Sequence, residues 1–269
     1  MSKGKLSFIG LGLYDEHDLS MKALNTIQQA DYVFAEFYTS ILSGSTLDHL
    51  KEVCNTEIIV LNRKQTEEAS VLLSKAKNNH VAFLVGGDAL TATTHVDLRI
   101  RAIQQDIETS VIHGSSVVTA VPGLLGLQHY KFGRITTLVT PQKQYFPMSP
   151  YDVIRENKKQ GLHSLVLLDI KADENTFMTA EQGIDLLRKM EEQKQKHILT
   201  DQTIICVVAR AGSKNPLVIA GTISQLKNQD FGLPLHTLVV PGSLHFMEIE
   251  ALEYLANLPE SIAQKLQKV

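Results

Sequence analysis

Residues 81–95 read V-A-F-L-V-G-G-D-A-L-T-A-T-T-H, an apolar run that ends in two glycines and an aspartate. A second run of this kind, F-I-G-L-G-L at residues 8–13, lies near the amino terminus. Short apolar runs that end in glycine are typical of buried strands in a parallel sheet. The carboxyl ends of such strands form the edge where α/β proteins bind ligands, and glycine there lets a ligand approach the backbone. The two stretches therefore predict an α/β fold with a ligand site at this edge.

Further apolar runs follow along the chain, with helical stretches between them. In the first part of the chain, strands are expected at residues 6–9, 31–37, 57–61, 81–85 and 111–113. In the second part, they are expected at residues 136–139, 164–168, 203–209, 217–220 and 235–240. We therefore predict two α/β lobes with mainly parallel sheets, residues 1–113 and residues 114–269, and a ligand in the cleft between the lobes.

Helix start signals support this division. Asp18 and Thr46 each precede an amphipathic stretch and are predicted N-caps. Ser149 followed by Pro150 predicts another helix start, and residues 179–182, T-A-E-Q, form a capping box. The helices of the second lobe are therefore better marked than those of the first.

Composition excludes several classes of protein. Of the 269 residues 43% are hydrophobic, which is enough for a substantial core and argues against disorder. The formal net charge is -3 and there is no basic run, so direct nucleic-acid binding is not expected. Residues 110–130 lack charged side chains, but Gly114, Pro122 and Gly123 interrupt them, so we expect a soluble crossover and no membrane span.

The cysteines and the start of the chain indicate the compartment. Cys54 and Cys206 lie far apart and form neither a disulfide framework nor a metal-binding spacing. The first residues, M-S-K-G-K, lead directly into a strand without the apolar segment of a signal peptide. We therefore predict a protein of the reducing cytoplasm.

A dinucleotide-binding site is the first alternative for the amino-terminal glycines. Gly10 and Gly12 follow a strand, and Asp31 is spaced to bind a ribose hydroxyl. The third glycine position is occupied by Asp15, however, and its carboxylate would repel a pyrophosphate. An NAD-dependent oxidoreductase is therefore disfavoured, and glycines that only permit a tight turn remain an alternative.

Other catalytic signatures are missing from the sequence. There is no G-x-x-x-x-G-K-[ST] phosphate loop, no G-x-S-x-G motif, no H-x-x-x-H pair and no D-x-D loop. We therefore predict no metal site and assign no catalytic residue. What remains is a site of backbone groups, small hydroxyls and carboxylates that positions a ligand.

Asp88 is the main polar candidate at the sheet edge. Its carboxylate can accept hydrogen bonds from sugar hydroxyls or an ammonium group, or it can cap the segment that follows. Thr91 and the following threonines add hydroxyl groups beside it. His113 ends another predicted strand and could act as a base, but no acidic partner is visible in the sequence, which favours a structural role.

Several stretches, in collinear order over nearly the whole chain, resemble the diphthine synthase family. They are F-I-G-L-G-L-Y-D-E at 8–16, D-Y-V-F-A-E-F-Y-T-S at 31–40, G-D-A-L-T-A-T-T-H at 87–95, L-L-D-I-K-A at 167–172, A-R-A-G-S at 209–213 and V-P-G at 240–242. Gly-Asp turns recur throughout the wider tetrapyrrole-methylase-like superfamily, whereas residues 35–40 and 168–171 are similar to the diphthine synthase branch. The compact form of the chain resembles the archaeal members.

The resemblance implies a homodimeric methyltransferase that uses S-adenosylmethionine and releases S-adenosylhomocysteine. It implies a tetrapyrrole-methylase-like fold with the cofactor in the cleft between the lobes. Its implied substrate is translation elongation factor 2, on which it methylates the amine of a 3-amino-3-carboxypropyl group attached to histidine, a step of diphthamide biosynthesis. The cofactor-binding residues implied at matching positions are Leu13, Asp88, Thr91, Ser116, Val117, Leu168, Ala211 and His236.

The chain departs from the family pattern at two turns. Gly86-Gly87-Asp88-Ala89 stands where the family often has P-G-D-P, and Gly114-Ser115 stands where it often has A-P or A-S. These loops should therefore be looser. The alternatives are a corrin-precursor methyltransferase of the same superfamily and a cofactor-sensing module without turnover.

Overall fold

The computed structural model describes residues 4–143 and 145–267, and its chain divides into two compact units. The first unit extends to Val117 and also includes Ile170–Thr176. The second unit comprises Val118–Asp169 and the chain from Phe177 onward. The predicted boundary between residues 113 and 114 lies close to the boundary after Val117. The inclusion of residues 170–176 in the first unit has no signal in the sequence.

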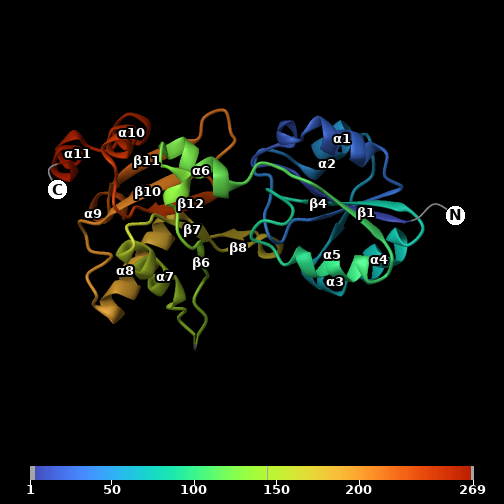
Figure 1. Cartoon of the computed structure of the whole chain (residues 1–269), viewed down its shortest axis with the longest axis horizontal. Helices are drawn as coiled ribbons and strands as arrows, with labels where there is room; N and C mark the ends of the chain where they lie inside the picture. The colour runs from blue at the N-terminus through green and yellow to red at the C-terminus, as the bar shows by residue number, and fades with distance from the viewer. Residues whose placement is uncertain (1–3, 144, 268–269) are drawn as a thin grey trace. The chain divides into compact units, whose positions relative to one another are not determined.

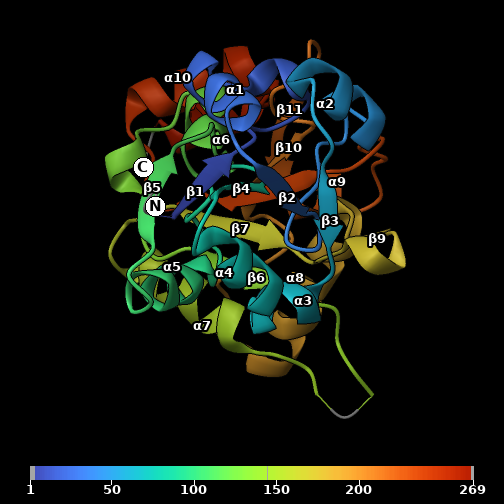
Figure 2. The same cartoon turned by 90° about the vertical axis from the view of Figure 1, so that its right-hand side faces the viewer.

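The first unit contains a five-stranded parallel sheet in the order β3-β2-β4-β1-β5. Figure 2 shows this order across the unit, from β5 on the left to β3 on the right. The parallel sheet predicted from the glycine-terminated runs is confirmed here. The strands are β1 (Lys5–Gly10), β2 (Tyr32–Glu36), β3 (Ile59–Leu61), β4 (His80–Val85) and β5 (Glu108–Ile112).

Helices cover both faces of this sheet. In Figure 1, α1 and α2 lie on one face and α3, α4 and α5 on the other. Alternate residues of β4 feed the two cores: Val81 and Phe83 pack on the α4–α5 side, and Ala82 and Leu84 on the α1–α2 side. The helices are α1 (Met21–Gln28), α2 (Leu47–Cys54), α3 (Arg63–Glu68), α4 (Ser70–Ala76) and α5 (His95–Ile103), with the 3₁₀ turn η1 (Glu16–Asp18).

The sheet of the second unit has the order β11-β10-β12-β7-β6 and is mainly antiparallel. Only β6 and β7 pair in parallel among the described strands of this sheet. The predicted mainly parallel sheet is therefore wrong for this unit, because β10 and β11 are joined as a hairpin and β12 lies antiparallel to both of its neighbours. The strands are β6 (Thr136–Leu138), β7 (Ser164–Leu168), β10 (Ile204–Ala209), β11 (Leu217–Thr222) and β12 (His236–Val240).

Helices again lie on both faces of the second sheet, with α7 and α8 on one and α6, α10 and α11 on the other (Figure 1). They are α6 (Val117–Leu125), α7 (Ser149–Lys159), α8 (Ala180–Lys194), α9 (Ile223–Leu226), α10 (Phe246–Ala256) and α11 (Glu260–Leu266), with the 3₁₀ turn η2 (His129–Lys131). The remaining short elements are β8 (Ile170–Lys171), η3 (Ala172–Glu174) and β9 (Thr176–Phe177). Within the described ranges, no helix combines the length and the apolar character needed to cross a membrane.

The predicted helix caps are partly confirmed. Thr46 caps α2, and the capping box at the start of α8 is formed by Thr179 and Gln182. The N-cap of α1 is Ser20 and not Asp18. Asp18 instead accepts hydrogen bonds from the backbone after β1, so it stabilises that turn and does not cap α1.

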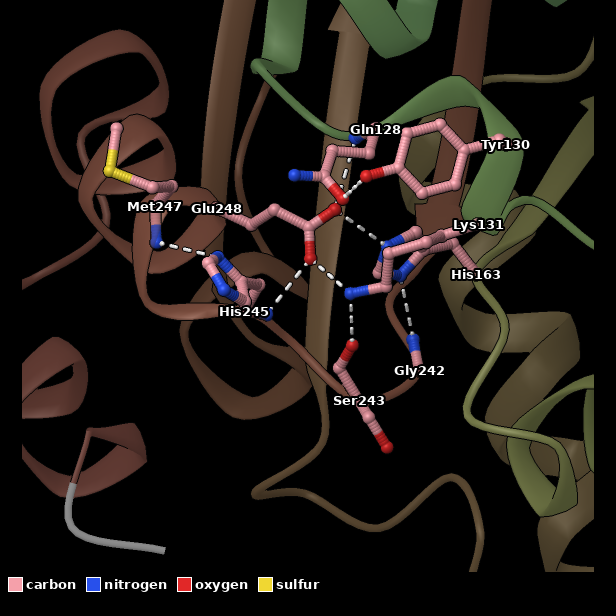
Figure 3. A network of polar contacts seen from close by, with 9 residues as sticks. All are labelled: Gln128, Tyr130, Lys131, His163, Gly242, Ser243, His245, Met247 and Glu248. Atoms are coloured by element: carbon pink, nitrogen blue, oxygen red, sulfur yellow. Dashed lines mark hydrogen bonds and ion pairs between the residues drawn. The ribbon is translucent and has the colours of Figure 1, made fainter.

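A buried carboxylate, Glu248 of α10, joins distant parts of the second unit (Figure 3). It accepts hydrogen bonds from the backbone N–H groups of Gln128 (3.0 Å) and His245 (2.9 Å) and pairs with the ammonium group of Lys131. His163 donates to it from Nε2 at 3.1 Å, because Nδ1 of His163 accepts the N–H of Gly242. Every donor around Glu248 favours its charged form.

The charges of this cluster are fixed by these contacts. Burial opposes the charge on Glu248, but the bonds from His245, Lys131 and Gln128 outweigh it and lower its pKa to about 2. Burial lowers the pKa of His163, so its imidazole is neutral. The cluster is therefore one Lys–Glu ion pair surrounded by neutral donors. Its contacts connect α10 to η2 through Lys131 and to the start of β7 through His163.

Candidate functional site

Three glycines bring strand ends together at the carboxyl edge of the first sheet. A Cβ on Gly10 would lie 2.6 Å from the carbonyl oxygen of Gly87, and a Cβ on Gly114 would lie 2.5 Å from the same atom. Gly12 and Gly87 also exchange backbone hydrogen bonds of 3.2 and 2.7 Å. Gly10 and Gly114 are thus needed for the approach of one backbone to another, whereas the sequence indicated a ligand-binding role for such glycines and left a purely structural turn as the alternative.

Gly87 is different from its neighbours. Its φ is +73°, and the nearest heavy atom to an added Cβ is the carbonyl oxygen of Ser115 at 4.0 Å. Space therefore lies over this residue, directly before Asp88. This turn retains the open backbone surface that the sequence predicted for a ligand.

Asp88 has three hydrogen-bonding neighbours at this edge. It accepts hydrogen bonds from the hydroxyl of Thr91 (3.0 Å) and the backbone N–H of Leu90 (3.3 Å), and Nδ1 of His113 lies 2.7 Å from its second oxygen. Burial opposes its charge, but the bonds from His113, Leu90 and Thr91 outweigh burial and lower the pKa of Asp88. Asp88 is therefore a carboxylate at neutral pH, with capacity for a further donor.

His113 therefore has the acidic partner that the sequence did not reveal. Its side chain is 77% exposed, whereas that of Asp88 is 10% exposed. The strands β4 and β5 that precede these residues do not pair, because β1 lies between them. The two loops meet over the end of β1, where Gly10 carries no side chain. The contact supplies the acidic partner, and the choice between a structural histidine and a base stays a prediction.

Leu13 lies in the turn that follows β1. The carboxylate of Asp18 accepts the N–H groups of Leu13 (3.0 Å) and Tyr14 (2.7 Å) and so fixes this turn. Only η1 follows directly, and α1 begins at Met21. The long helix that receives a pyrophosphate in dinucleotide folds is therefore not placed at this strand end.

The remaining residues predicted in the first unit follow β5. Ser116 is half-buried in the loop after His113, and Val117 begins α6. Leu13, Asp88 and Ser116 thus follow three adjacent strands, β1, β4 and β5, at their carboxyl ends. The structure gathers these predicted residues at one edge of the first sheet.

The residues predicted in the second unit also gather at one edge, that of the second sheet. Leu168 ends β7, His236 begins β12 and Ala211 follows β10, and these three strands are neighbours. Leu168 is buried in the core against Gly183. The N–H of Arg210 donates to the carbonyl of Leu235 at 2.8 Å, which aligns the loop after β10 with the start of β12.

His236 uses both ring nitrogens within its own unit. Nδ1 accepts the N–H of Ala180 at 3.0 Å, so Nε2 carries the hydrogen and donates to the carbonyl of Leu233 at 2.9 Å. Burial lowers the pKa of His236, and its imidazole is neutral. Any cofactor contact by His236 would therefore come from its backbone or its ring carbon atoms.

One group of side chains among the described residues could offer three metal ligands: Asp15, Glu16 and His17, all adjacent in sequence. The side chain of His17 is 82% exposed, and Asp15 already accepts its backbone N–H at 3.0 Å. Asp15 is the N-cap of η1, so its carboxylate has a structural role in this exposed group.

A profile of the family described as Tetrapyrrole (Corrin/Porphyrin) Methylases matches residues 5–227. The chain belongs to the tetrapyrrole methylase family. The family assignment makes it a methyltransferase and confirms the resemblance and the α/β class expected from the sequence, although the sheet of the second unit is mainly antiparallel.

Relatives within the tetrapyrrole methylase family align with nearly the full length of this chain. The diphthine synthase of Methanosphaera stadtmanae is 46% identical over 257 residues, which are 96% of this chain and 98% of that one. The diphthine synthase of Methanothermobacter thermautotrophicus is 48% identical over 261 residues, 97% and 99% of the two chains. A crystal structure of diphthine synthase has a TM-score of 0.88 at 35% identity, covering 97% of this chain and 99% of its own.

Proposed function

We propose that this member of the tetrapyrrole methylase family acts as a diphthine synthase. It would transfer methyl groups from S-adenosylmethionine to the amine of the 3-amino-3-carboxypropyl group on a modified histidine of translation elongation factor 2. The observation that supports this proposal is the 46–48% identity to diphthine synthases over nearly the whole of both chains. The fold similarity to a solved diphthine synthase agrees with it.

The described residues of the first unit fit a nucleoside-type cofactor. Space over Gly87 leaves its backbone open to a ligand, and the neighbouring Asp88 is ionised. A carboxylate with unused acceptor capacity suits hydroxyl or ammonium donors, both of which S-adenosylmethionine carries. We therefore retain the predicted cofactor residues as a proposal: Leu13, Asp88, Thr91, Ser116 and Val117 of the first unit, and Leu168, Ala211 and His236 of the second.

The chemistry needs alignment more than a reactive side chain. The cofactor supplies an electrophilic methyl group on a sulfonium centre. The chain must hold the acceptor amine in line with this group, exclude water and keep the amine neutral. Burial of the amine would lower its pKa and increase the neutral fraction, so no dedicated base is required. We assign no catalytic base.

The proposed cellular setting follows from the same resemblance. We propose a cytoplasmic homodimer whose protein partner is elongation factor 2, without direct contact to nucleic acid or membrane. The absence of a basic run from the sequence supports the exclusion of nucleic acid. Light scattering at several concentrations would test the dimer independently of activity.

Mass spectrometry tests the proposed reaction. Purified elongation factor 2 that bears the 3-amino-3-carboxypropyl histidine is incubated with this protein and S-adenosylmethionine, and the modified peptide is weighed. Mass gains in methyl units on that histidine are expected, and their number counts the transfers. Methylation of a corrin precursor without any gain on the histidine would instead favour the alternative methyltransferase. Tight cofactor binding with neither product would favour the sensing module.

A further inference from the structure

Two buried ionisable side chains face each other in the first unit, and neither belongs to the cofactor set. Glu36 is the last residue of β2 and has no exposed surface, and His95 is the first residue of α5 and is 2% exposed. Nε2 of His95 lies 3.6 Å from Oε1 of Glu36. Burial of a facing acid and base is costly unless their protons are arranged to satisfy both.

The hydrogen bonds define the tautomer of His95. Its Nδ1 lies 3.3 Å from the carbonyl oxygen of Ala89, which can only accept, so Nδ1 carries a hydrogen. Nε2 has no hydrogen-bond partner among the described atoms, although its ring is packed edge-on against Phe83 with the centroids 5.2 Å apart. A neutral His95 therefore directs a bare lone pair at Glu36.

Glu36 also has hydrogen-bond donors in the loop after β2. Thr39 donates its backbone N–H to Oε2 at 3.0 Å and its hydroxyl to Oε1. If Glu36 were ionised beside a neutral His95, two lone pairs would face each other in a buried space. One proton placed on Glu36 and directed at Nε2 removes this repulsion, and a small approach of the two atoms from 3.6 Å makes the contact a hydrogen bond.

Burial favours the neutral pair. Burial raises the pKa of Glu36 despite the bonds from Thr39 and the nearby charge of Arg63, and burial lowers the pKa of His95. Arg63 of α3 lies over the ring of Tyr38, 5.2 Å from its centroid. Burial raises the pKa of Tyr38 to about 12, so this side chain is also neutral.

The pair connects two loops at the carboxyl edge of the sheet. Glu36 holds Thr39 in the loop after β2, and His95 holds Ala89 in the turn after β4 that contains Asp88. These loops touch directly, because a Cβ on Gly86 would lie 2.9 Å from that of Ser40. The loop after β2 also lines an apolar pocket of about 240 Å³ with α2, formed by Phe37, Ile41, Leu42, Ser45, Thr46, Leu47 and Leu50.

We propose that Glu36 and His95 share one proton and, as a neutral hydrogen-bonded pair, are positioning residues that hold the Asp88 turn in its cofactor-binding geometry. This inference rests on the proposed function, because the turn matters only if it binds a cofactor. The pair does not touch the reacting atoms. Its effect is transmitted through Ala89, the residue next to Asp88.

Nitrogen NMR of the histidine rings tests the shared proton directly, with His95→Gln used to assign the signal. We expect a neutral His95 with Nδ1 protonated and Nε2 accepting a hydrogen bond. In Glu36→Ala the Nε2 signal should move to the position of a free imine nitrogen. Two protonated ring nitrogens in the wild-type protein, or an Nε2 signal unchanged in Glu36→Ala, would overturn the assignment.

Calorimetry with S-adenosylhomocysteine tests the positioning role. Glu36→Ala should weaken the affinity about tenfold, and Glu36→Gln, whose amide can donate to Nε2, should recover most of that loss. Glu57→Gln, the same change at an exposed carboxylate, is the matched control and should bind like wild type. Equal damage from the Gln and Ala variants, or wild-type affinity in Glu36→Ala, would contradict the proposal.

These outcomes are separable from those of the proposed function. Neither NMR nor calorimetry uses elongation factor 2, so a protein that binds the cofactor but leaves that substrate unmodified still tests the pair. Thermal unfolding of each variant, followed by circular dichroism, reports whether it is folded at the temperature of the binding experiment. Glu36→Gln keeps the shape of the side chain and is the variant on which the decision rests if Glu36→Ala does not fold.

Discussion

Nδ1 of His113 lies 2.7 Å from the carboxylate of Asp88, and the strands that deliver these two residues do not pair with each other. The contact passes over the end of β1, at Gly10. The exposed imidazole and the nearly buried carboxylate therefore depend on close packing of three backbones. This dependence makes both the glycines and the Asp88 carboxylate testable.

Gly10→Ala should destabilise the protein by about 1–3 kcal/mol, because its Cβ would overlap backbone atoms that cannot move independently. The matched control is Gly123→Ala in α6, where an added Cβ meets no atom within 4 Å and the helix should gain up to about 1 kcal/mol. Urea denaturation followed by circular dichroism measures both. Equal stabilities of the two variants would contradict the close approach at Gly10.

Asp88→Asn should weaken binding of S-adenosylhomocysteine about tenfold, since the ionised acceptor beside Gly87 is lost. Because hydrogen bonds lower the pKa of Asp88, its charge is present at neutral pH and is lost only as the pH falls through that lowered value. Cofactor affinity in the wild type should therefore not change with this group between about pH 6 and 8. Calorimetry at several pH values measures this, with the exposed Asp97→Asn as control.

Glu248→Gln should lower the free energy of unfolding by about 3 kcal/mol, because an amide presents donors to Lys131 and His163 and leaves the partly buried ammonium without its counter-charge. The control is Glu250→Gln, an exposed carboxylate on the same helix, which should have little effect. Chemical denaturation of the two variants gives the comparison. A loss no larger than that of the control would show that the cluster contributes nothing to stability.

The same carboxylate predicts an acid limit to stability. Its pKa of about 2 in the folded protein lies below the ordinary value of 4.5, so its contribution is present above pH 4.5 and is lost as the pH falls toward 2. Thermal unfolding of wild type and Glu248→Gln should therefore converge as the pH is lowered through this window. A constant difference between them down to the lowest pH would be inconsistent with this titration.

Both cysteines should be unreactive while the protein is folded. Burial raises the pKa of Cys54 to about 11 and also raises that of Cys206, and only the thiolate reacts readily. A chromogenic disulfide reagent should modify neither thiol in the native protein at neutral pH and both after denaturation. Rapid modification before unfolding would mean that one of these side chains opens to solvent.

The first sheet could be predicted because its strands are continuous apolar runs such as residues 81–85, whose orientation follows from the helices between them. The second sheet could not, since strands such as β10 and β12 carry the same apolar signal whichever way they pair. Strand direction there depends on the connections, for which single-residue patterns give little information.

The candidate site could also be predicted from the sequence only in part. Asp88 was found from its own turn, because a carboxylate after two glycines is a local signal. Its contact with His113 required knowledge that β1 lies between β4 and β5, and the pairing of Glu36 with His95 required the position of α5. Contacts of this kind depend on strand order and helix packing, which no local pattern contains.

Because Ile170–Thr176 belongs to the first unit, the gene segment for that unit is not continuous. A gene fragment that ends at Val117 would encode a first unit without its last segment, and the complementary fragment would carry that segment as a foreign loop. A single recombination crossover after Val117 would therefore transfer the first unit without its last segment, and exchange of the complete unit takes two further crossovers, one on each side of residues 170–176.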